Sequence, residues 1–235
     1  MMLEIKNLNV SYGVIPVLHD VDMYIEKGEL VSLLGSNGAG KTTLLNTISG
    51  LLRPSSGSII FNGKNIEYSQ PQNIVKGGIS QIPEGRKIFP FLTVKENLFM
   101  GASTRDAWGK RHEMFDLVTG IFPILAERRD QRASLMSGGE QQMLVIARGL
   151  MARPELLMID EPSLGLSPAF QEQIYEAIEK LPEQGVTVLL AEQNAQISLE
   201  ISTRGYVMQD GEIVMEGTSG ELLVSDLIKQ AYMGV

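Results

Sequence analysis

The sequence predicts an α/β fold with a mostly parallel sheet and an inserted helical part. Predicted strands and helices alternate over residues 155–217, which is the pattern of a parallel sheet covered by helices. Residues 30–34 are a short, continuously apolar run that leads into a glycine-rich loop, as expected of a buried parallel strand. Strand signals disappear over residues 86–136. This interruption predicts a helical subdomain inside the α/β core.

The composition is that of an ordinary globular chain. Its 235 residues are 43% hydrophobic and 20% charged, which suits one large domain or a domain with an insertion. The net charge of −8 argues against broad, sequence-independent nucleic-acid binding, which needs a basic surface. The chain has no cysteine, so thiolates cannot build a disulfide, zinc or iron–sulfur site.

No segment predicts targeting or membrane insertion. Residues 1–6 carry an early acid, Glu4, and alternate like a strand, so we expect no signal peptide. No apolar run approaches the ~18–20 residues of a membrane span. Any role at a membrane would therefore depend on a partner.

The N-terminal third is predicted as strands around one helix. Apolar patterns indicate strands within residues 3–34, the last of which precedes the glycine-rich loop. Apolar residues then recur at helical spacing over residues 44–52, and residues 54–57 are expected to end that helix. Residues 58–63 predict another strand with its turn.

The remaining elements follow from capping patterns and periodicity. Thr93 and Glu96 form a capping box that opens a helix, and residues 113–122 have helical periodicity. Beyond the helical part we expect strands at 156–159, 186–191, 205–208 and 212–216 and helices at 168–181, 194–201 and 218–233.

Residues 35–42 match the phosphate-binding loop Gly-x4-Gly-Lys-Thr between a strand and a helix. The glycines allow backbone N–H groups to converge on phosphate oxygens, and the helix N-terminus adds a favourable field. Lys41 is expected on the β- and γ-phosphates, and Thr42 is expected to offer its hydroxyl to Mg²⁺. A glycine-rich turn that merely contains a lysine is the plainer alternative, which this context disfavours.

Residues 156–161, Leu-Leu-Met-Ile-Asp-Glu, form an apolar strand that ends in two carboxylates. Such a strand can hold Asp160 near Mg²⁺ and Glu161 near an attacking water. Alone, this pair is also typical of a solvated strand end. Together with the phosphate loop, it predicts half of a nucleotide site.

A third motif, Ser137-Gly138-Gly139-Glu140, precedes an apolar-periodic helix and matches a capping box. Capping alone would not require the two glycines, which weaken a first helical turn. A serine and two glycines at a helix N-terminus also suit an anion site. The motif is therefore interpreted both as a cap and as a functional segment.

The order of these motifs resembles the ATP-binding subunit of ABC transporters. The phosphate loop is followed by Ser-Gly-Gly-Glu-Gln, by the strand ending in Asp-Glu and by Ser-Leu-Gly-Leu-Ser at 163–167, over essentially the whole chain. The resemblance implies a single P-loop ABC ATPase domain. Its mixed-sheet core, with an N-terminal antiparallel β part, would comprise residues 1–85 and 155–235, and its helical subdomain residues 86–154.

The resemblance also implies how the motifs act. Two chains would pack head to tail, with each ATP between one chain's phosphate loop and the other chain's signature segment. Tyr12 matches the aromatic residue that stacks on adenine, Glu161 the catalytic base, and residues 163–167 the loop that crosses the dimer interface. The expected nucleotide-binding residues also include Gly35, Ser36, Asn37, Gly38, Ala39, Gly40, Lys41, Thr42, Thr43 and, from the signature segment, Ser137, Gly138, Gly139 and Glu140.

Two positions depart from the family's usual pattern. In place of a glutamine that contacts Mg²⁺ and senses the γ-phosphate, the chain has Glu84, which can still ligate Mg²⁺; Gln81 is the alternative. In place of a switch histidine stands Gln193, which can donate a hydrogen bond to the γ-phosphate but cannot take a proton. The expected catalytic residues are thus Glu161, Lys41 and Gln193, and the expected metal ligands are Thr42, Asp160 and Glu84. His19 and His112 match no catalytic motif.

These departures, with residues 83–86 and 230–234, resemble the LivF-type ATPases of branched-chain amino acid importers. The resemblance implies ATP and Mg²⁺ as cofactors. The implied partners are a second cassette, identical or LivG-type, transmembrane permease subunits and, indirectly, an extracytoplasmic binding protein, with no nucleic acid. The chain would be peripheral at the cytoplasmic face of the inner or plasma membrane. An ABC ATPase for another substrate and a soluble regulatory ATPase acting on ribosomes or DNA remain as alternatives.

Overall fold

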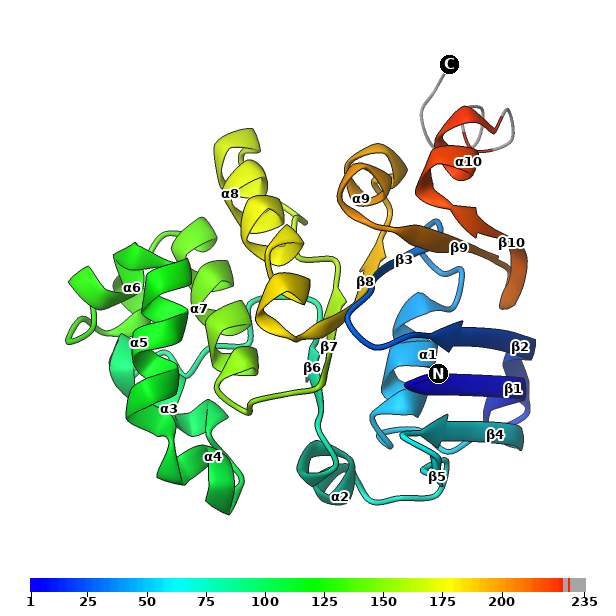
Figure 1. The fold of residues 1–235 in the computed structure, drawn as a ribbon, viewed down its shortest axis with the longest axis horizontal. Coiled ribbons are helices and arrows are strands. Elements are labelled where there is room, and N and C mark those ends of the chain that lie inside the picture. Colours follow the sequence, from blue (N-terminus) through cyan, green and yellow to red (C-terminus); the bar gives the residue numbers. More distant parts are fainter. Residues whose placement is uncertain (226–227, 229–235) are drawn as a thin grey trace.

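Two sheets and a group of helices make up the fold (Figure 1). The computed structural model describes residues 1–225 and residue 228. Within them the strands are β1 (Leu3–Tyr12), β2 (Ile15–Ile25), β3 (Leu30–Leu34), β4 (Ser56–Phe61), β5 (Lys64–Asn65), β6 (Ile79–Ile82), β7 (Leu156–Asp160), β8 (Thr187–Glu192), β9 (Arg204–Gln209) and β10 (Glu212–Thr218).

The helices in the same part of the chain are α1 (Lys41–Ile48), α2 (Pro71–Lys76), α3 (Val94–Gly101), α4 (Arg105–Gly109), α5 (Arg111–Ile121), α6 (Pro123–Glu127), α7 (Gly138–Leu150), α8 (Pro168–Glu179), α9 (Ala195–Ile201) and α10 (Ser219–Val224), with short 3₁₀ turns η1 (Ala133–Leu135) and η2 (Pro182–Gln184).

The larger sheet carries the site. Its order is β10-β9-β3-β8-β7-β6, with β6, β7, β8, β3 and β9 parallel and β10 antiparallel at the edge. Every residue of β3, β7 and β8 is buried, which explains why the sequence shows them as continuous apolar runs. The carboxyl ends of these three strands meet at one edge, where ligands bind in open α/β sheets.

The smaller sheet is antiparallel, in the order β2-β1-β4-β5. Helix α1 lies between the two sheets (Figure 1). Its Leu44, Leu45 and Ile48 are fully buried in one apolar cluster that also contains Leu3 from β1 and Met158 from β7. The predicted mixed α/β fold with an N-terminal antiparallel part is confirmed.

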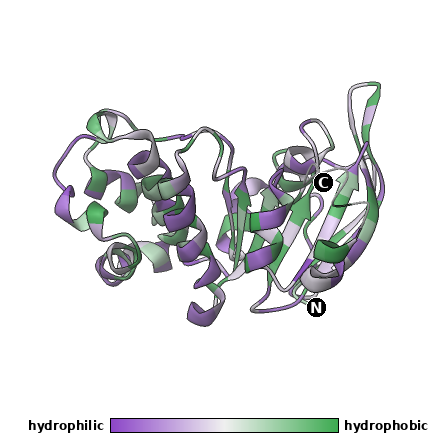
Figure 2. Ribbon diagram, turned by 90° about the horizontal axis from the view of Figure 1, so that it is seen from above, coloured by the Kyte–Doolittle hydropathy of each residue, from purple (hydrophilic) through white to green (hydrophobic). Residues whose placement is uncertain are grey.

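Helices α3 to α7 gather at the side of the larger sheet beyond β6 (green in Figure 1). Their buried residues, among them Val94, Val118 and Leu144, share one apolar cluster with Leu157 of β7 and Ile174 of α8. Figure 2 shows the green, hydrophobic stretches in the strands and purple, hydrophilic stretches on the outer helices. A continuous core therefore joins these helices to the sheet.

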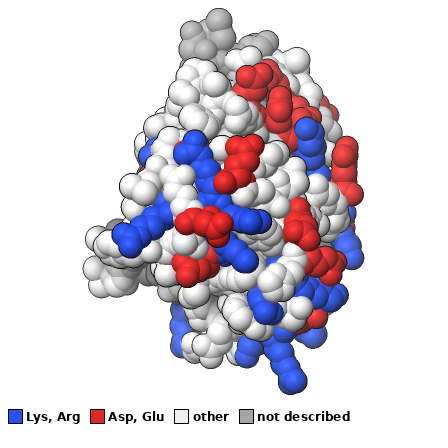
Figure 3. Space-filling model, turned by 90° about the vertical axis from the view of Figure 1, so that its left-hand side faces the viewer, with Lys and Arg blue, Asp and Glu red and all other residues white. Residues whose placement is uncertain are grey.

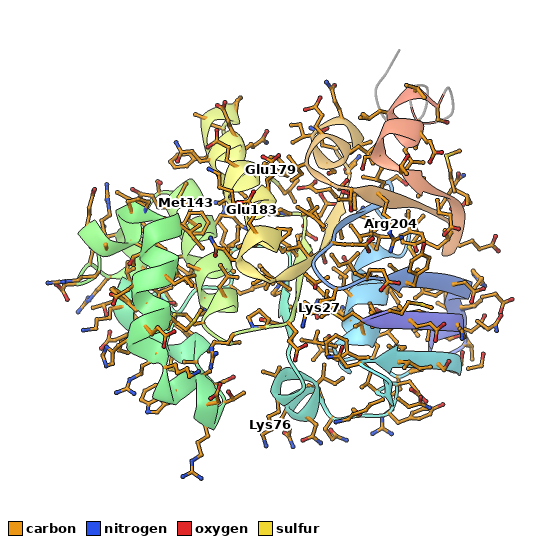
Figure 4. All side chains as sticks on the ribbon, viewed as in Figure 1. Lys27, Lys76, Met143, Glu179, Glu183 and Arg204 are labelled. Atoms are coloured by element: carbon orange, nitrogen blue, oxygen red, sulfur yellow. The ribbon has the colours of Figure 1, made fainter. Side chains whose placement is uncertain are left out.

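The two sheets are also joined by polar contacts of Arg204, which extends from β9 (Figure 4). Its guanidinium forms an ion pair with Glu29 at 3.0 Å and donates to the hydroxyl of Tyr206 at 2.7 Å. The Tyr206 hydroxyl in turn donates to the backbone carbonyl of Tyr24 in β2 at 3.1 Å.

Several boundaries differ from the sequence prediction. The helix after the phosphate loop ends at Ile48 instead of continuing to residue 52, because Gly50 adopts the left-handed backbone that stops it. Helix α2 was not predicted, and the helix expected at 168–181 ends at Glu179. Of the helix expected at 218–233, the structure has Ser219–Val224; residues 226–227 and 229–235, and with them the 230–234 pattern, lie outside the described residues. None of the helices in the described part of the chain has both the length and the hydropathy of a membrane span.

Asn97 fixes the segment that leads from β6 into α3. Its side chain is fully buried, and it accepts from the Phe89 N–H at 2.9 Å and donates to the carbonyls of Phe89 and Thr93 at 2.9 and 3.0 Å. The predicted capping box is also present, since Thr93 and Glu96 exchange both bonds. Together these contacts determine how the chain enters the helical part.

We expect Asn97→Ala to lower the free energy of unfolding by about 1–3 kcal/mol, because it leaves backbone groups of Phe89 and Thr93 without partners. The measurement is denaturant unfolding of the variant and of Asn73→Ala, which removes an exposed amide from α2. Equal stability of the two variants would contradict the role given to Asn97.

Candidate active site

The phosphate loop lies between β3 and α1. Gly40 is the N-cap of α1, with φ 112°, and no side chain caps the helix. A Cβ on Gly40 would lie 2.7 Å from the side chain of Leu18, so the left-handed backbone and the close packing both require glycine. The first N–H groups of α1 are thus left for an anionic ligand.

A cavity of about 420 Å³ opens over this loop. It brings together most of the predicted phosphate-site residues with two acidic side chains from other loops, and its lining is Val17, Ser36, Asn37, Gly38, Gly40, Lys41, Thr42, Thr43, Glu84 and Glu161. No residue of the signature segment 137–140 lines it.

Lys41 and Glu161 form an ion pair at the floor of this cavity. The Lys41 Nζ lies 3.0 Å from Glu161 Oε1, with side chains that are 5% and 9% exposed. Lys41 also donates to the carbonyls of Gly35 and Ser36 at 2.6 and 3.2 Å. Glu161 Oε1 makes no hydrogen bond, so the angles of this contact do not meet hydrogen-bond geometry. The two opposite charges still attract each other strongly, because they are close together and largely buried.

Glu161 has a strained backbone. Its φ of 47° lies in the left-handed region, which is costly for a residue with a side chain, by about 1–3 kcal/mol. Its N–H donates to the carbonyl of Ala191 in β8 at 2.9 Å. This bond turns the chain at the end of β7 so that the Glu161 side chain reaches the cavity.

Asp160 and Thr42 meet beside the pair. The Thr42 hydroxyl donates to Asp160 Oδ2 at 2.8 Å, and Asp160 is fully buried with its Oδ1 unpartnered. Burial raises the pKa of Asp160; the bond from Thr42 lowers it, and the charge of Glu161 raises it further.

The Thr42 and Asp160 oxygens fit Mg²⁺. An orphaned buried carboxylate oxygen beside a hydroxyl is what this ion uses in nucleotide sites, where one or two protein groups hold it and phosphates and waters supply the remaining ligands. The described residues contain no group of three or more His, Cys, Asp or Glu that could hold a metal ion. Thr42 and Asp160 would therefore supply only part of a magnesium shell.

Glu84 and Gln81, the two candidates for the position where the family usually has a glutamine, face different places. Glu84 lines the cavity, and its charge contributes to the raised pKa of Asp160. Gln81 donates to the Asn46 side chain at 2.9 Å and faces a separate groove. Only Glu84 thus faces the place where phosphates would lie.

Tyr12 ends β1 beside the phosphate loop. Its ring is 47% exposed, and its hydroxyl lies 3.5 Å from Thr43 Oγ1. An exposed ring at this position is available for stacking.

Gln193 is exposed and does not line the cavity. Its N–H donates to Glu192 Oε2 at 3.2 Å. In this structure, then, Gln193 is near the site but outside it.

The signature segment forms the N-terminus of α7, away from the cavity. Ser137 and Glu140 exchange both capping-box bonds, and Glu140 pairs with Arg128 at 3.1 Å. A Cβ on Gly139 would overlap the ring of Phe170 in α8. The glycines thus have a packing reason in addition to the anion-binding role inferred from the sequence.

Glu192 and Tyr175 match none of the sequence motifs, yet they lie next to the site. Glu192 is 1% exposed and accepts from the Tyr175 hydroxyl at 2.7 Å. Burial raises the pKa of both groups. The charge of Glu192 raises the pKa of Tyr175 further, whereas the hydrogen bond from Tyr175 lowers the pKa of Glu192. The available signal was an acid that ends the apolar strand β8, as Asp160 ends β7.

Comparison with known proteins identifies the family. A family model described as ABC transporter matches residues 18–164. The chain belongs to the ABC transporter family. It is an ABC-type ATPase, as the sequence predicted, and members of this family bind ATP.

Full-length relatives are similar throughout. The chain is 47% identical over 233 residues to the high-affinity branched-chain amino acid transport ATP-binding protein BraG of Pseudomonas aeruginosa, covering 99% of this chain and 100% of that protein. It is 38% identical to the probable branched-chain amino acid transport ATP-binding protein LivF of Archaeoglobus fulgidus, covering 100% and 99%. The solved structure of MJ1267, an ATP-binding cassette of an ABC transporter, superimposes with a TM-score of 0.86 at 26% identity, covering 98% of each chain.

Asp160→Asn tests the electrostatics of this family member's site. The pKa of Asp160 is higher in the folded chain than in the unfolded chain. Ionisation of Asp160 therefore lowers the free energy of unfolding at pH values above the ordinary aspartate pKa, and this destabilisation vanishes as the pH falls to that value. The variant removes the charge and keeps an acceptor for Thr42. We expect the nucleotide-free variant to have a higher melting temperature than the wild type at pH 8.5. This difference in melting temperature should be at least as large at pH 8.5 as at pH 6.

The measurement is a thermal melt across this pH range. Asp116→Asn, an exposed substitution on α5, serves as the control and should change the melting temperature little. A lower melting temperature for Asp160→Asn at pH 8.5 would show that the buried charge does not limit stability.

Proposed function

We propose that the chain is the ATP-binding and ATP-hydrolysing subunit of an ABC importer for branched-chain amino acids. The observation that carries the proposal is the division of the site: Lys41 and Glu161 share one cavity, and the signature segment at residues 137–140 lies outside it. A nucleotide bound here would need a second chain to complete its contacts. The similarity to BraG and LivF supports the substrate class.

The first step proposed is an exchange of partners by Lys41. The γ-phosphate of ATP carries more charge than the Glu161 carboxylate, so Lys41 turns to the phosphate while backbone N–H groups at the start of α1 bind its oxygens. Glu161 is then free to accept a proton from the attacking water. Thr42 and Asp160 would hold Mg²⁺, which would neutralise the phosphate charge that develops in the reaction, and Glu84 faces the same space.

The second cassette, identical or different, would supply its own signature segment to this cavity. In return, Ser137, Gly138 and Gly139 of this chain would face the partner's nucleotide from the N-terminus of α7. Donors from both chains around one phosphate would close the dimer, and hydrolysis would reopen it. Tyr12 would stack on adenine, and Gln193 would reach the γ-phosphate on closure. In this scheme residues 86–154 act as a helical subdomain that moves with closure.

The permease subunits would bind at a groove next to the helical part. A cavity of about 400 Å³ lies between α2, β6, α3 and α7. Its rim includes Leu51, Phe89 and Met100, which are 63%, 43% and 54% exposed. Exposed apolar side chains around a groove are typical of a protein interface. This attachment would place the chain at the cytoplasmic face of the membrane.

A regulatory ATPase acting on ribosomes or DNA is less well supported. The face at the helical end of the molecule carries Lys and Arg interspersed with Asp and Glu (Figure 3), and the net charge is −8. Sequence-independent nucleic-acid binding needs a predominantly basic surface. We therefore favour a membrane partner.

Glu161→Gln is expected to lower the kcat of ATP hydrolysis in the assembled complex by about 10²–10⁴-fold, because the amide cannot accept the proton. ATP binding is expected to stay equal or become tighter, since Lys41 loses a competing carboxylate. Steady-state hydrolysis and nucleotide binding measure the two effects, with the exposed Glu172→Gln of α8 as the control. Hydrolysis near the wild-type rate would refute the role of Glu161.

Met100→Glu is expected to reduce recovery of permease subunits in affinity purification from solubilised membranes, because it places a charge in the apolar groove. ATP binding by the variant should equal that of the wild type. Val214→Glu, at an exposed position on β10, is the matched control and should retain the permeases. Recovery of the wild-type chain only as a cytosolic monomer would contradict the transporter function altogether.

A further inference from the structure

A buried carboxylate outside the proposed chemistry lies where three loops of the site meet. Glu192 is the last residue of β8 and is paired with Leu34, the last residue of β3. Its carbonyl accepts the N–H of Gly35, the first residue of the phosphate loop, at 3.3 Å. The main chain of Glu192 is therefore attached to the start of the phosphate loop.

The side chain of Glu192 reaches the other two loops. Its Oε1 accepts from the Tyr175 hydroxyl at 2.7 Å and from the Ser163 N–H at 3.4 Å. Its Oε2 accepts from its neighbour Gln193 N–H at 3.2 Å. Ser163 follows Glu161 by two residues, so this one carboxylate connects the loop that carries Glu161 with the loop that carries Gln193.

The environment gives this carboxylate no compensating charge. Among the ion pairs of the described residues, none involves Glu192, and Lys41 pairs with Glu161. Burying a carboxylate without a cation is costly, and hydrogen bonds offset that cost only in part. An apolar residue would suit the end of a buried strand better. The acid therefore needs an explanation other than stability.

We propose that Glu192 is a positioning residue that fixes Glu161 and Gln193 in place relative to the phosphate loop. Tyr175 of α8 holds the Glu192 carboxylate through its hydrogen bond. The strained φ of Glu161 persists only if the surrounding structure fixes the segment around it. The bond that the Glu161 N–H donates to the Ala191 carbonyl fixes this segment at Glu161, and the bond that the Ser163 N–H donates to the Glu192 carboxylate fixes it at Ser163. This inference rests on the proposed ATPase function, because it assigns Glu192 an effect on that reaction.

The test compares Glu192→Gln and Tyr175→Phe with the wild-type chain in its assembled membrane complex. We expect Glu192→Gln to lower kcat by about 10–100-fold, the effect of a misplacement on the order of 1 Å in a catalytic group. Tyr175→Phe should lower kcat by a smaller factor of roughly 3–10, and the double variant should be no slower than Glu192→Gln alone, as expected of residues that act as one unit. The Kd for ATP should change by less than about threefold.

Tyr206→Phe is the matched control. Tyr206 is fully buried and its hydroxyl is hydrogen-bonded, as that of Tyr175 is, but it lies on β9 against Tyr24 and Arg204, away from the cavity. It should lower the melting temperature and leave kcat unchanged. A purely structural role for Tyr175 would give the same result as this control.

The inference is overturned if Glu192→Gln hydrolyses ATP within about twofold of the wild type, or if kcat and ATP affinity fall in parallel. Should Glu192→Gln not fold, Tyr175→Phe decides the matter, and a wild-type kcat for it overturns the inference. Failure of the proposed function is recognised separately, as hydrolysis that is unaffected by Lys41→Ala.

Discussion

The contact between Lys41 and Glu161 is the interaction on which the site depends. It joins the phosphate loop to the end of β7 at 3.0 Å and nearly buries two opposite charges. An ion pair exposed to water contributes little to stability. Here both groups are largely buried, so loss of either partner would leave the other as an uncompensated buried charge. The parallel strands β3, β8 and β7 place these two loops at the same edge of the sheet, on either side of the end of β8, so the sheet positions the pair. A nucleotide that takes Lys41 also leaves Glu161 without its cation, which links binding to activation of the base.

The fold was largely predictable from the sequence because its buried strands and its helix caps leave local signals. The runs at β3, β7 and β8 and the capping boxes at Thr93 and Ser137 were recognised from residue type and spacing alone, and the family resemblance was confirmed. Helix α2, of only six residues, escaped detection because so short a helix has little periodicity. The early end of α1 depends on the backbone angle of Gly50, whereas the apolar pattern continued past it.

The site was predictable only in part. Motifs indicated the phosphate loop and the acidic end of β7, and the cavity brings these together with Glu84. The pairing of Lys41 with Glu161, and the choice between Glu84 and Gln81, depend on how separate loops approach one another. Glu192 and Tyr175 were missed for the same reason, since the hydrogen bond between them joins the end of a strand to the middle of a helix.

The contact of Gly139 with Phe170 has a mechanical consequence. Because the ring already occupies the space where a Cβ would be, α7 and the first turn of α8 have no clearance between them at this point. Interiors packed this closely transmit displacement instead of absorbing it. A force that reached the start of α7 from a neighbouring chain would therefore press on α8, and α8 carries Tyr175 in the same helix. Substitution of Gly139 even by alanine would force the Phe170 ring to move or would push α7 and α8 apart.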